Sequence, residues 1–130
     1  MSPQPPSSKL SAPSVAVIGA TGAVGREFIA LFEQRKFPTT SLRLFASARS
    51  AGQSLKVGHR DFVIEELTED ALRGVDIALF SAGASTSRAF APVAASHGAV
   101  VVDNSSAFRM DPGTPLVVPE VNAQALAPHR

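Results

Sequence analysis

Three glycines spaced three residues apart are the first feature of this sequence with a chemical use. Gly19, Gly22 and Gly25 stand in the segment GATGAVG, directly after the apolar run 15–18. A strand that ends in such a turn and opens a helix is typical of dinucleotide-binding domains, because glycine permits a sharp turn and a close approach of pyrophosphate. The first amide groups of the helix would face the anion, and Thr21 could add a hydroxyl donor. The alternative is a tight turn that holds nothing; a P-loop is excluded because no Gly-Lys-Ser/Thr follows.

The segment SARSAG at 47–52, which follows the second apolar run, indicates which dinucleotide would bind. Domains that prefer NAD usually carry an acidic residue here for the ribose 2′-hydroxyl, and this segment has none. It offers Ser47, Arg49 and Ser50 instead, and a guanidinium can bind a 2′-phosphate through charge-assisted hydrogen bonds. We therefore predict NADP over NAD. The alternative is a solvated arginine in a surface loop.

Two later segments place further polar residues where strands should end. The run SAGASTS at 81–87 has small residues that would let a cofactor pass close by, and Ser85 or Thr86 could cap the next helix. The run DNSSAFRM at 103–110 is dense in polar groups, as expected for the wall of a site. Within it, Arg109 could hold an anionic substrate group; the alternative is a salt bridge to a neighbouring aspartate, Asp103 or Asp111.

The elements that must position these segments follow from the hydrophobic pattern. Short apolar runs alternate with helical patterns, as in a parallel sheet whose strands are buried on both faces. A hairpin is expected at 55–65, around Gly58 and His59, and a short helix capped by Thr68 should end at Gly74. The fold class is therefore α/β: a doubly wound, Rossmann-type parallel sheet with a small antiparallel hairpin inserted. The expected strands are 15–18, 42–46, 77–80 and 100–102. The helix expected after the glycines covers 22–35 and should bury a stripe of Val24, Phe28, Leu31 and Phe32. A later helix is indicated by the same spacing of Phe90, Val93, Ala94 and His97.

Composition narrows the class of protein further. The 130 residues suffice for one domain, 45% are hydrophobic, and no apolar run approaches a membrane-spanning length. Twelve basic and 11 acidic residues give a net charge of +1 without a basic block, so we expect neither a nucleic-acid nor a membrane partner. The chain has no cysteine, and its three histidines (His59, His97 and His129) lack the spacing of metal ligands. With no secretory signal in view, we expect a cytoplasmic protein, or a plastid one if the source is eukaryotic.

Taken together, the motifs resemble the aspartate-semialdehyde dehydrogenase family. The matching segments are GATGAVG (19–25), SARSAG (47–52), IEEL (64–67), GVDIALFSAG (74–83), VVVDNSSAFRM (100–110) and PLVVPEVN (115–122). The family reduces L-aspartyl 4-phosphate to the 4-semialdehyde with NADPH, releases phosphate, and serves lysine, threonine and methionine biosynthesis. Its members form homodimers or homotetramers.

The resemblance also implies roles for individual residues. Asn104 would lie near the reacting centre, and Arg109 would bind the phosphate of an acyl phosphate substrate. The cofactor site would comprise Gly19, Thr21, Gly22, Ala23, Val24 and Gly25 at the pyrophosphate, Ser47, Arg49 and Ser50 at the 2′-phosphate, and Ser81, Ala82 and Gly83 along the cofactor.

This chain departs from the family in lacking the cysteine nucleophile that follows the PEVN segment and the acid–base histidine of a second domain. We expect a disordered tail at 1–14, an NADP-binding domain at 15–122, and at 123–130 the start of a missing catalytic and dimerisation domain. Near that end, the prolines Pro112, Pro115, Pro119 and Pro128 predict extended, turning chain instead of another βα unit. We expect the chain to be a fragment or truncated product that is inactive alone, with apolar area exposed near its C-terminal segment.

Three other readings remain open from the residues. N-acetyl-glutamyl-phosphate reductase shares the fold and the chemistry, although DNSSAFRM and SARSAG fit it less well. The second reading is an epimerase- or NmrA-like NADP-binding protein. Its epimerase form needs a Tyr-x-x-x-Lys pair and is excluded because this chain has no tyrosine, which leaves the sensor form. A standalone NADP-binding module without catalysis is the non-enzyme alternative.

Overall fold

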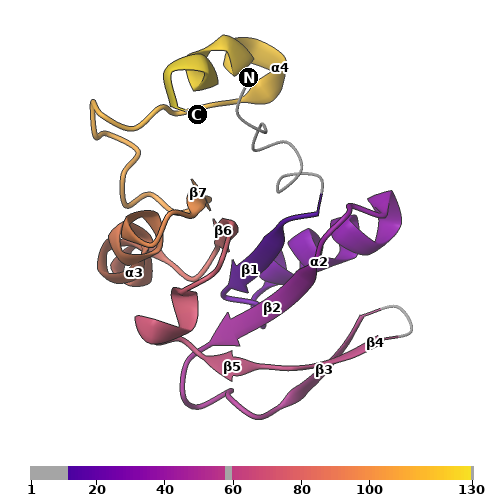
Figure 1. The fold of residues 1–130 in the computed structure, drawn as a ribbon. Coiled ribbons are helices and arrows are strands. Elements are labelled where there is room, and N and C mark those ends of the chain that lie inside the picture. Colours follow the sequence, from indigo (N-terminus) through magenta and orange to yellow (C-terminus); the bar gives the residue numbers. More distant parts are fainter. Residues whose placement is uncertain (1–11, 58–59, 130) are drawn as a thin grey trace, which may run out of the picture.

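The computed structural model describes residues 12–57 and 60–129 and has one parallel sheet as its centre (Figure 1). The strand order is β5-β2-β1-β6-β7, and every neighbouring pair in this sheet runs parallel. The order reverses between β1 and β6, which is where doubly wound sheets bind ligands. The strands are β1 (Ser14–Ile18), β2 (Ser41–Ala46), β5 (Glu65–Glu66), β6 (Ile77–Phe80) and β7 (Val100–Asp103).

Two helices cover the sheet, and β1 shows how their two cores divide. Successive side chains of a strand point to opposite faces. Ala16 and Ile18 belong to a buried cluster on the side of α3 (Ala84–Ser96), whereas Val17 belongs to the cluster on the side of α2 (Ala23–Arg35). The fold class expected from the sequence, a doubly wound parallel sheet, is confirmed.

The inserted hairpin is also confirmed: β3 (Ser54–Val57) pairs antiparallel with β4 (Arg60–Val63), and the expected turn at Gly58 and His59 lies outside the described residues. The short helix after it is a single 3₁₀ turn, Asp70–Leu72, instead of an α-helix. The Thr68 hydroxyl does accept the Ala71 amide at 3.1 Å, as expected of a capping residue.

The buried stripe expected on α2 is only partly correct. Phe28 and Phe32 pack against the core, but the fully buried positions are Gly25 and Ile29. Val24 and Leu31 are 40% and 41% exposed. The buried face is therefore rotated from the predicted one and is centred on a glycine.

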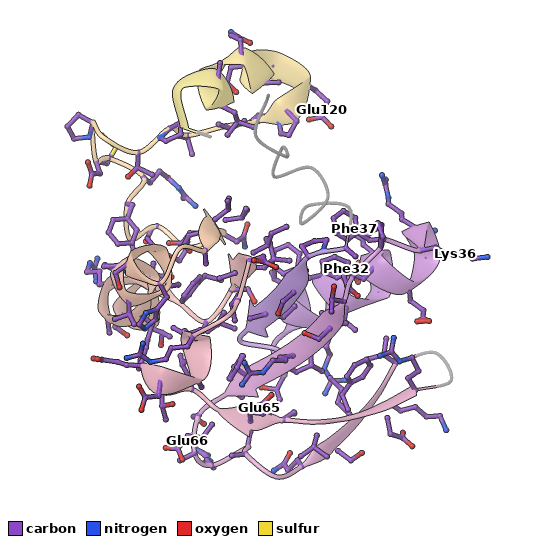
Figure 2. All side chains as sticks on the ribbon, viewed as in Figure 1. Phe32, Lys36, Phe37, Glu65, Glu66 and Glu120 are labelled. Carbon is purple, nitrogen blue, oxygen red and sulfur yellow. The ribbon has the colours of Figure 1, made fainter. Side chains whose placement is uncertain are left out.

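The end of α2 is closed by a residue in a left-handed conformation. Lys36 has a φ of 51°, and its amide and that of Phe37 bond to carbonyls of the last turn. The Phe32 and Phe37 rings then meet edge to face with centroids 5.1 Å apart (Figure 2).

The prolines predicted extended chain in the C-terminal part, and this part is only partly extended. It contains α4 (Pro119–Asn122) and a 3₁₀ helix (Ala123–His129), because Pro119 stands at the first position of a helix, where its missing N–H costs no bond. Figure 1 shows this segment apart from the sheet. Its exposed apolar side chains, with those of β7, agree with the expected apolar area: Val100, Val102, Met110, Leu116, Val118, Val121 and Leu126.

At the N-terminal side, Ser14 already belongs to β1, and the Thr40 amide donates to the carbonyl of Pro13 at 2.9 Å. Most of the expected tail, 1–11, lies outside the described residues. No helix in the described ranges is long and apolar enough to cross a membrane. Within these same ranges, no cluster of His, Cys, Asp or Glu could hold a metal ion.

Candidate functional site: a glycine-lined cleft at the sheet's switch point

The turn after β1 is fixed by the neighbouring strands. The amides of Gly19 and Ala20 both donate to the carbonyl of Phe45 in β2, at 2.9 and 3.1 Å. On the other side, the Ser81 amide and hydroxyl after β6 donate to the carbonyl of Ile18, at 2.8 and 3.2 Å. The turn is thus held from both sides at the carboxyl ends of three adjacent strands.

Two of the three glycines are required by the fold itself. Gly19 has a φ of 93°, and a Cβ there would lie 2.8 Å from the backbone carbon of Ser81. A Cβ on Gly25 would lie 2.1 Å from the carbonyl oxygen of Gly19. Both are far inside van der Waals contact, so these positions allow the close approach of α2 and β6 to the turn.

Gly22 is different, because no contact within the protein requires a glycine there. Its φ of −79° suits any residue, and a Cβ would meet only the oxygen of Gly19, at an ordinary 3.5 Å. Its missing side chain leaves space at the start of α2 on the exposed side. This is the arrangement in which a pyrophosphate can approach the backbone closely.

The start of α2 favours an anion. Its N-cap makes no side-chain hydrogen bond, and its first turn contains no acidic residue. The first amides, from Ala23 to Gly25, have no partner within the helix, and the helix dipole adds partial positive charge. Arg26 follows directly, and its Nε donates to the Thr21 carbonyl at 3.3 Å.

A cleft of about 490 Å³ opens beside this turn, within the range of small-molecule and cofactor sites. It brings together six residues singled out in the sequence: Gly19, Thr21, Gly22, Ser47, Ser81 and Ala82. The remaining lining comes from Ile18, Ala46, Leu67, Thr86 and Phe90.

None of these five lining residues was predicted as a site residue, and three of them lie outside the expected strands. Leu67 follows β5, a strand that was not predicted. Thr86 and Phe90 stand four apart on α3, so a helical pattern places them on one face, and Phe90 was already assigned to the helix. Extending that face back by one turn would have found Thr86.

The start of α3 faces the same cleft, and the expected cap is absent. Gly83 is the N-cap, with a φ of 101° and a ψ of 165°, and no side chain caps the helix. The prediction that Ser85 or Thr86 caps it is therefore wrong. The glycine backbone makes the turn by itself, and no capping side chain accepts a hydrogen bond from the first backbone N–H groups of α3.

Arg49 stands in the turn that leaves the cleft after Ser47. The amides of Ser50 and Ala51 donate to the Ser47 carbonyl, at 2.9 and 3.1 Å. Arg49 is exposed and makes no hydrogen bond or ion pair with any described residue. Its guanidinium is thus accessible to solvent and to a ligand.

Arg43 in β2, unlike Arg49, uses its guanidinium in hydrogen bonds within the protein. Its Nε and Nη2 donate to Glu65 at 3.0 and 2.8 Å, and its Nη1 donates to the Ala71 carbonyl at 3.0 Å. Hydrogen bonding to Glu65 raises the pKa of the Arg43 guanidinium above its ordinary value. The pair attaches the two-residue strand β5 to the sheet.

Asn104 and Arg109 do not line the glycine cleft. They line a second groove of about 490 Å³, which is bounded by α3, β7 and the segment 114–117. The Asn104 amide donates to the carbonyl of Phe80 at 2.9 Å, so its loop starts beside the strand that leads to Ser81. Arg109 lies 3.5 and 3.4 Å from the carbonyl oxygens of Asn104 and Ser105, and its alternative salt bridges to Asp103 and Asp111 are not formed.

The fold and the cleft define a dinucleotide-binding domain of the doubly wound class. Residues 14–129 match the family described as semialdehyde dehydrogenase, NAD binding domain. The chain therefore belongs to the aspartate-semialdehyde dehydrogenase family and comprises its N-terminal NAD(P)-binding domain.

Relatives agree with this assignment. The aspartate-semialdehyde dehydrogenase of Aquifex aeolicus is 53% identical over 111 residues, which are 85% of this chain and 33% of that protein. The crystal structure of aspartate semialdehyde dehydrogenase II from Vibrio cholerae, complexed with ASA, superposes with a TM-score of 0.84 at 45% identity, covering 89% of this chain and 38% of that one. The Candida albicans enzyme, with NADP, gives a TM-score of 0.72 at 26% identity, covering 89% and 36%. The chain thus spans about a third of the length of its relatives.

Proposed function

We propose that this chain is the NADPH-binding part of an enzyme that reduces L-aspartyl 4-phosphate to aspartate 4-semialdehyde and phosphate. The observation that carries the proposal is Gly22. It is the one glycine of the turn that neither its backbone angles nor its neighbours require, and it stands at an uncapped helix start beside the cleft. Close approach of a bound pyrophosphate to the backbone would explain why a glycine stands there.

The residues present fit this cofactor. The amides of residues 21–25 would hold the pyrophosphate, while Ser81, Ala82 and Gly83 would border the ribose and nicotinamide portion. Ser47, Arg49 and Ser50 would meet the 2′-phosphate, since Arg49 has no competing partner among the described residues and Ser47 lines the cleft. NADPH, when bound, supplies the hydride; the protein's part here is to bind and orient it.

Titration of the 130-residue chain with NADPH and NADH tests the cofactor preference. We expect NADPH to bind at least about tenfold more tightly, because one charge-assisted hydrogen bond contributes about 1.5–3 kcal/mol. NADPH fluorescence is a direct readout, since the chain has no tryptophan. Equal affinities for the two nucleotides would exclude NADP selectivity.

Arg49→Ala identifies the residue responsible. We expect it to weaken NADPH at least about tenfold and to leave NADH unchanged, because only NADPH carries the 2′-phosphate. Arg35→Ala removes the same charge from the last turn of α2, at the end away from the cleft, and serves as the matched control. A loss of NADPH affinity equal in both variants would indicate a general charge effect.

The proposed substrate side comprises Asn104 near the reacting carbon and Arg109 at the phosphate. The reaction requires a thiolate that attacks the acyl phosphate, displaces phosphate and forms a thioester acyl-enzyme, whose carbonyl carbon would accept the hydride. This chain has no cysteine to supply that thiolate. We therefore expect the purified 130-residue chain to bind NADPH without turnover. NADPH formation from aspartate semialdehyde, phosphate and NADP by this chain alone would contradict the thiolate route.

A further inference from the structure

A buried hydroxyl connects the helix beside the cofactor cleft to the loop that carries Arg109. Ser87 is the only polar side chain in the described part of the chain that is fully buried, with 0% exposure. It follows Thr86, a residue of the cleft, in the first turns of α3. Its Oγ donates to Oδ1 of Asp103 at 3.0 Å. A buried hydroxyl needs a partner, and here that partner is a carboxylate on another element.

Asp103 uses its remaining acceptor capacity on its own loop. Oδ1 accepts the Ser105 amide at 2.8 Å, and Oδ2 accepts the Ser105 hydroxyl at 3.0 Å. The Ser105 oxygen in turn accepts the Ala107 amide at 3.2 Å. Three bonds to one carboxylate therefore fix the course of the chain through Asn104 and Ser105.

Arg109 rests on that same stretch of backbone. Its Nη2 approaches the carbonyl oxygens of Asn104 and Ser105, at 3.5 and 3.4 Å, and no carboxylate among the described residues pairs with it. The position of the guanidinium therefore depends on where the loop lies. The loop in turn depends on Asp103.

We propose that Asp103 is a positioning residue: through Ser87 and Ser105 it holds Asn104 and Arg109 in an anion-binding arrangement next to the cofactor cleft. The inference rests on the proposed function in that Arg109 binds the phosphate of the substrate. Asp103 does not line the glycine cleft, and both of its carboxylate oxygens accept hydrogen bonds from Ser87 or Ser105.

The sign of the effect separates positioning from electrostatics. A carboxylate near an anion site repels the anion, so removing its charge alone should strengthen phosphate binding. If Asp103 acts by geometry, removing its hydrogen bonds should weaken phosphate binding. Asp103→Asn removes the charge but keeps a side-chain oxygen that can accept the Ser87 hydroxyl and the Ser105 backbone amide. Its NH₂ group can donate to the Ser105 hydroxyl oxygen. Asp103→Ala removes both the charge and the bonds.

The experiment is a titration of the ¹⁵N-labelled 130-residue chain with inorganic phosphate, read at the Arg109 side-chain and Asn104 amide resonances. A parallel NADPH titration is read at the amides of Gly22 and Ala23. We expect Asp103→Ala to weaken phosphate binding at Arg109 at least about tenfold, the scale of one lost charge-assisted hydrogen bond. Asp103→Asn should bind phosphate as well as the parent or better, and both variants should keep their NADPH affinity.

A second pair of variants keeps the test valid if Asp103→Ala does not fold. Ser105→Ala removes one bond to Asp103 and the acceptor of the Ala107 amide. Ser106→Ala changes a neighbouring exposed serine whose side chain makes no hydrogen bond within residues 12–57 and 60–129. We expect Ser105→Ala to weaken phosphate binding at Arg109 and Ser106→Ala to leave it unchanged.

Undiminished phosphate affinity in Asp103→Ala or, failing that, Ser105→Ala would overturn the inference. So would the absence of any phosphate response at Arg109 in the parent chain, because there would then be no anion site to position. NADPH binding decides the cofactor proposal separately. If NADPH fails to bind while the phosphate pattern holds, the cofactor proposal is wrong and the role of Asp103 stands.

Discussion

Two helices begin at the same cleft, and both begin at a glycine without a side-chain cap. At the start of α2, two glycines allow close packing: Gly25 lies against the backbone of Gly19, and Gly19 against Ser81. At the start of α3, Gly83 has nothing within 4 Å of where a Cβ would stand, and only its backbone angles require glycine. A glycine at a helix start can thus serve packing, conformation or, as we propose for Gly22, access for a ligand. The three reasons predict different consequences of the same substitution to alanine.

Gly25→Ala should have the largest effect on stability. In a helix this change ordinarily gains about 1 kcal/mol. Here the new Cβ would stand 2.1 Å from the Gly19 oxygen, so α2 must move away from β1. We expect the free energy of unfolding to fall by about 3 kcal/mol, as for severe overpacking, measured by urea denaturation followed by circular dichroism. Stability at or above that of the parent would show that α2 can shift easily, and the packing explanation would be lost.

Gly83→Ala should cost less, because the strain is local. A φ of 101° with a ψ of 165° is a region that essentially only glycine adopts, and other residues there cost about 1–3 kcal/mol. Gly98→Ala, beyond the other end of α3, is a control with similar positive φ and open space. Both should lower the unfolding free energy, whereas only Gly83→Ala should also weaken NADPH binding. Equal NADPH affinities in the two variants would separate the start of α3 from the cofactor site.

Gly22→Ala should leave the fold almost intact and weaken the ligand. Its backbone angles suit alanine and its Cβ would make only an ordinary contact, so we expect a stability change below about 1 kcal/mol. The methyl group would stand where the pyrophosphate must approach, and we expect NADPH affinity to fall at least about tenfold. Isothermal titration measures it. Unchanged affinity would remove the observation on which the proposed function depends.

Thr86→Ala should have the smallest effect of the four. Thr86 lines the cleft from α3, and a single neutral hydrogen bond contributes about 1 kcal/mol, so we expect NADPH to bind only a few-fold more weakly. Ser85→Ala, one residue earlier and outside the cleft lining, should change nothing. If Ser85→Ala had the larger effect, the cofactor would follow a different path along α3.

The parallel strands and the glycine turn were predictable because their determinants are local. A continuous apolar run followed by glycines at fixed spacing indicates both a buried strand and its turn. The strand β5 was not predictable in this way, since Glu65 and Glu66 carry no apolar pattern. They join the sheet through pairing with Phe45 and Ala46 and through the bonds between Glu65, labelled in Figure 2, and Arg43, 22 residues away.

The face of α2 was placed incorrectly for a related reason. Hydrophobic periodicity predicted that Val24 and Leu31 are buried, but both are exposed. The helix packs close to the turn after β1 through Gly25, which a hydrophobic pattern cannot detect because glycine has no side chain. For the site, sequence motifs located Gly19, Gly22, Ser47 and Ser81, which line one cleft. They could not show that Asn104 and Arg109 line another groove, because that depends on how the chain after β7 packs against α3.

The two edge strands of the sheet differ in length and in polarity. One is β5, two residues long and made of glutamates; the other is β7, four residues long, with Val100 and Val102 about half exposed. Unpaired strand borders are templates for a further strand, and short or charged ones resist it. Lateral growth of this sheet is therefore directed to the β7 side, next to the loop of Asn104 and Arg109, so an incoming strand would settle against the proposed substrate groove and leave the glycine turn untouched.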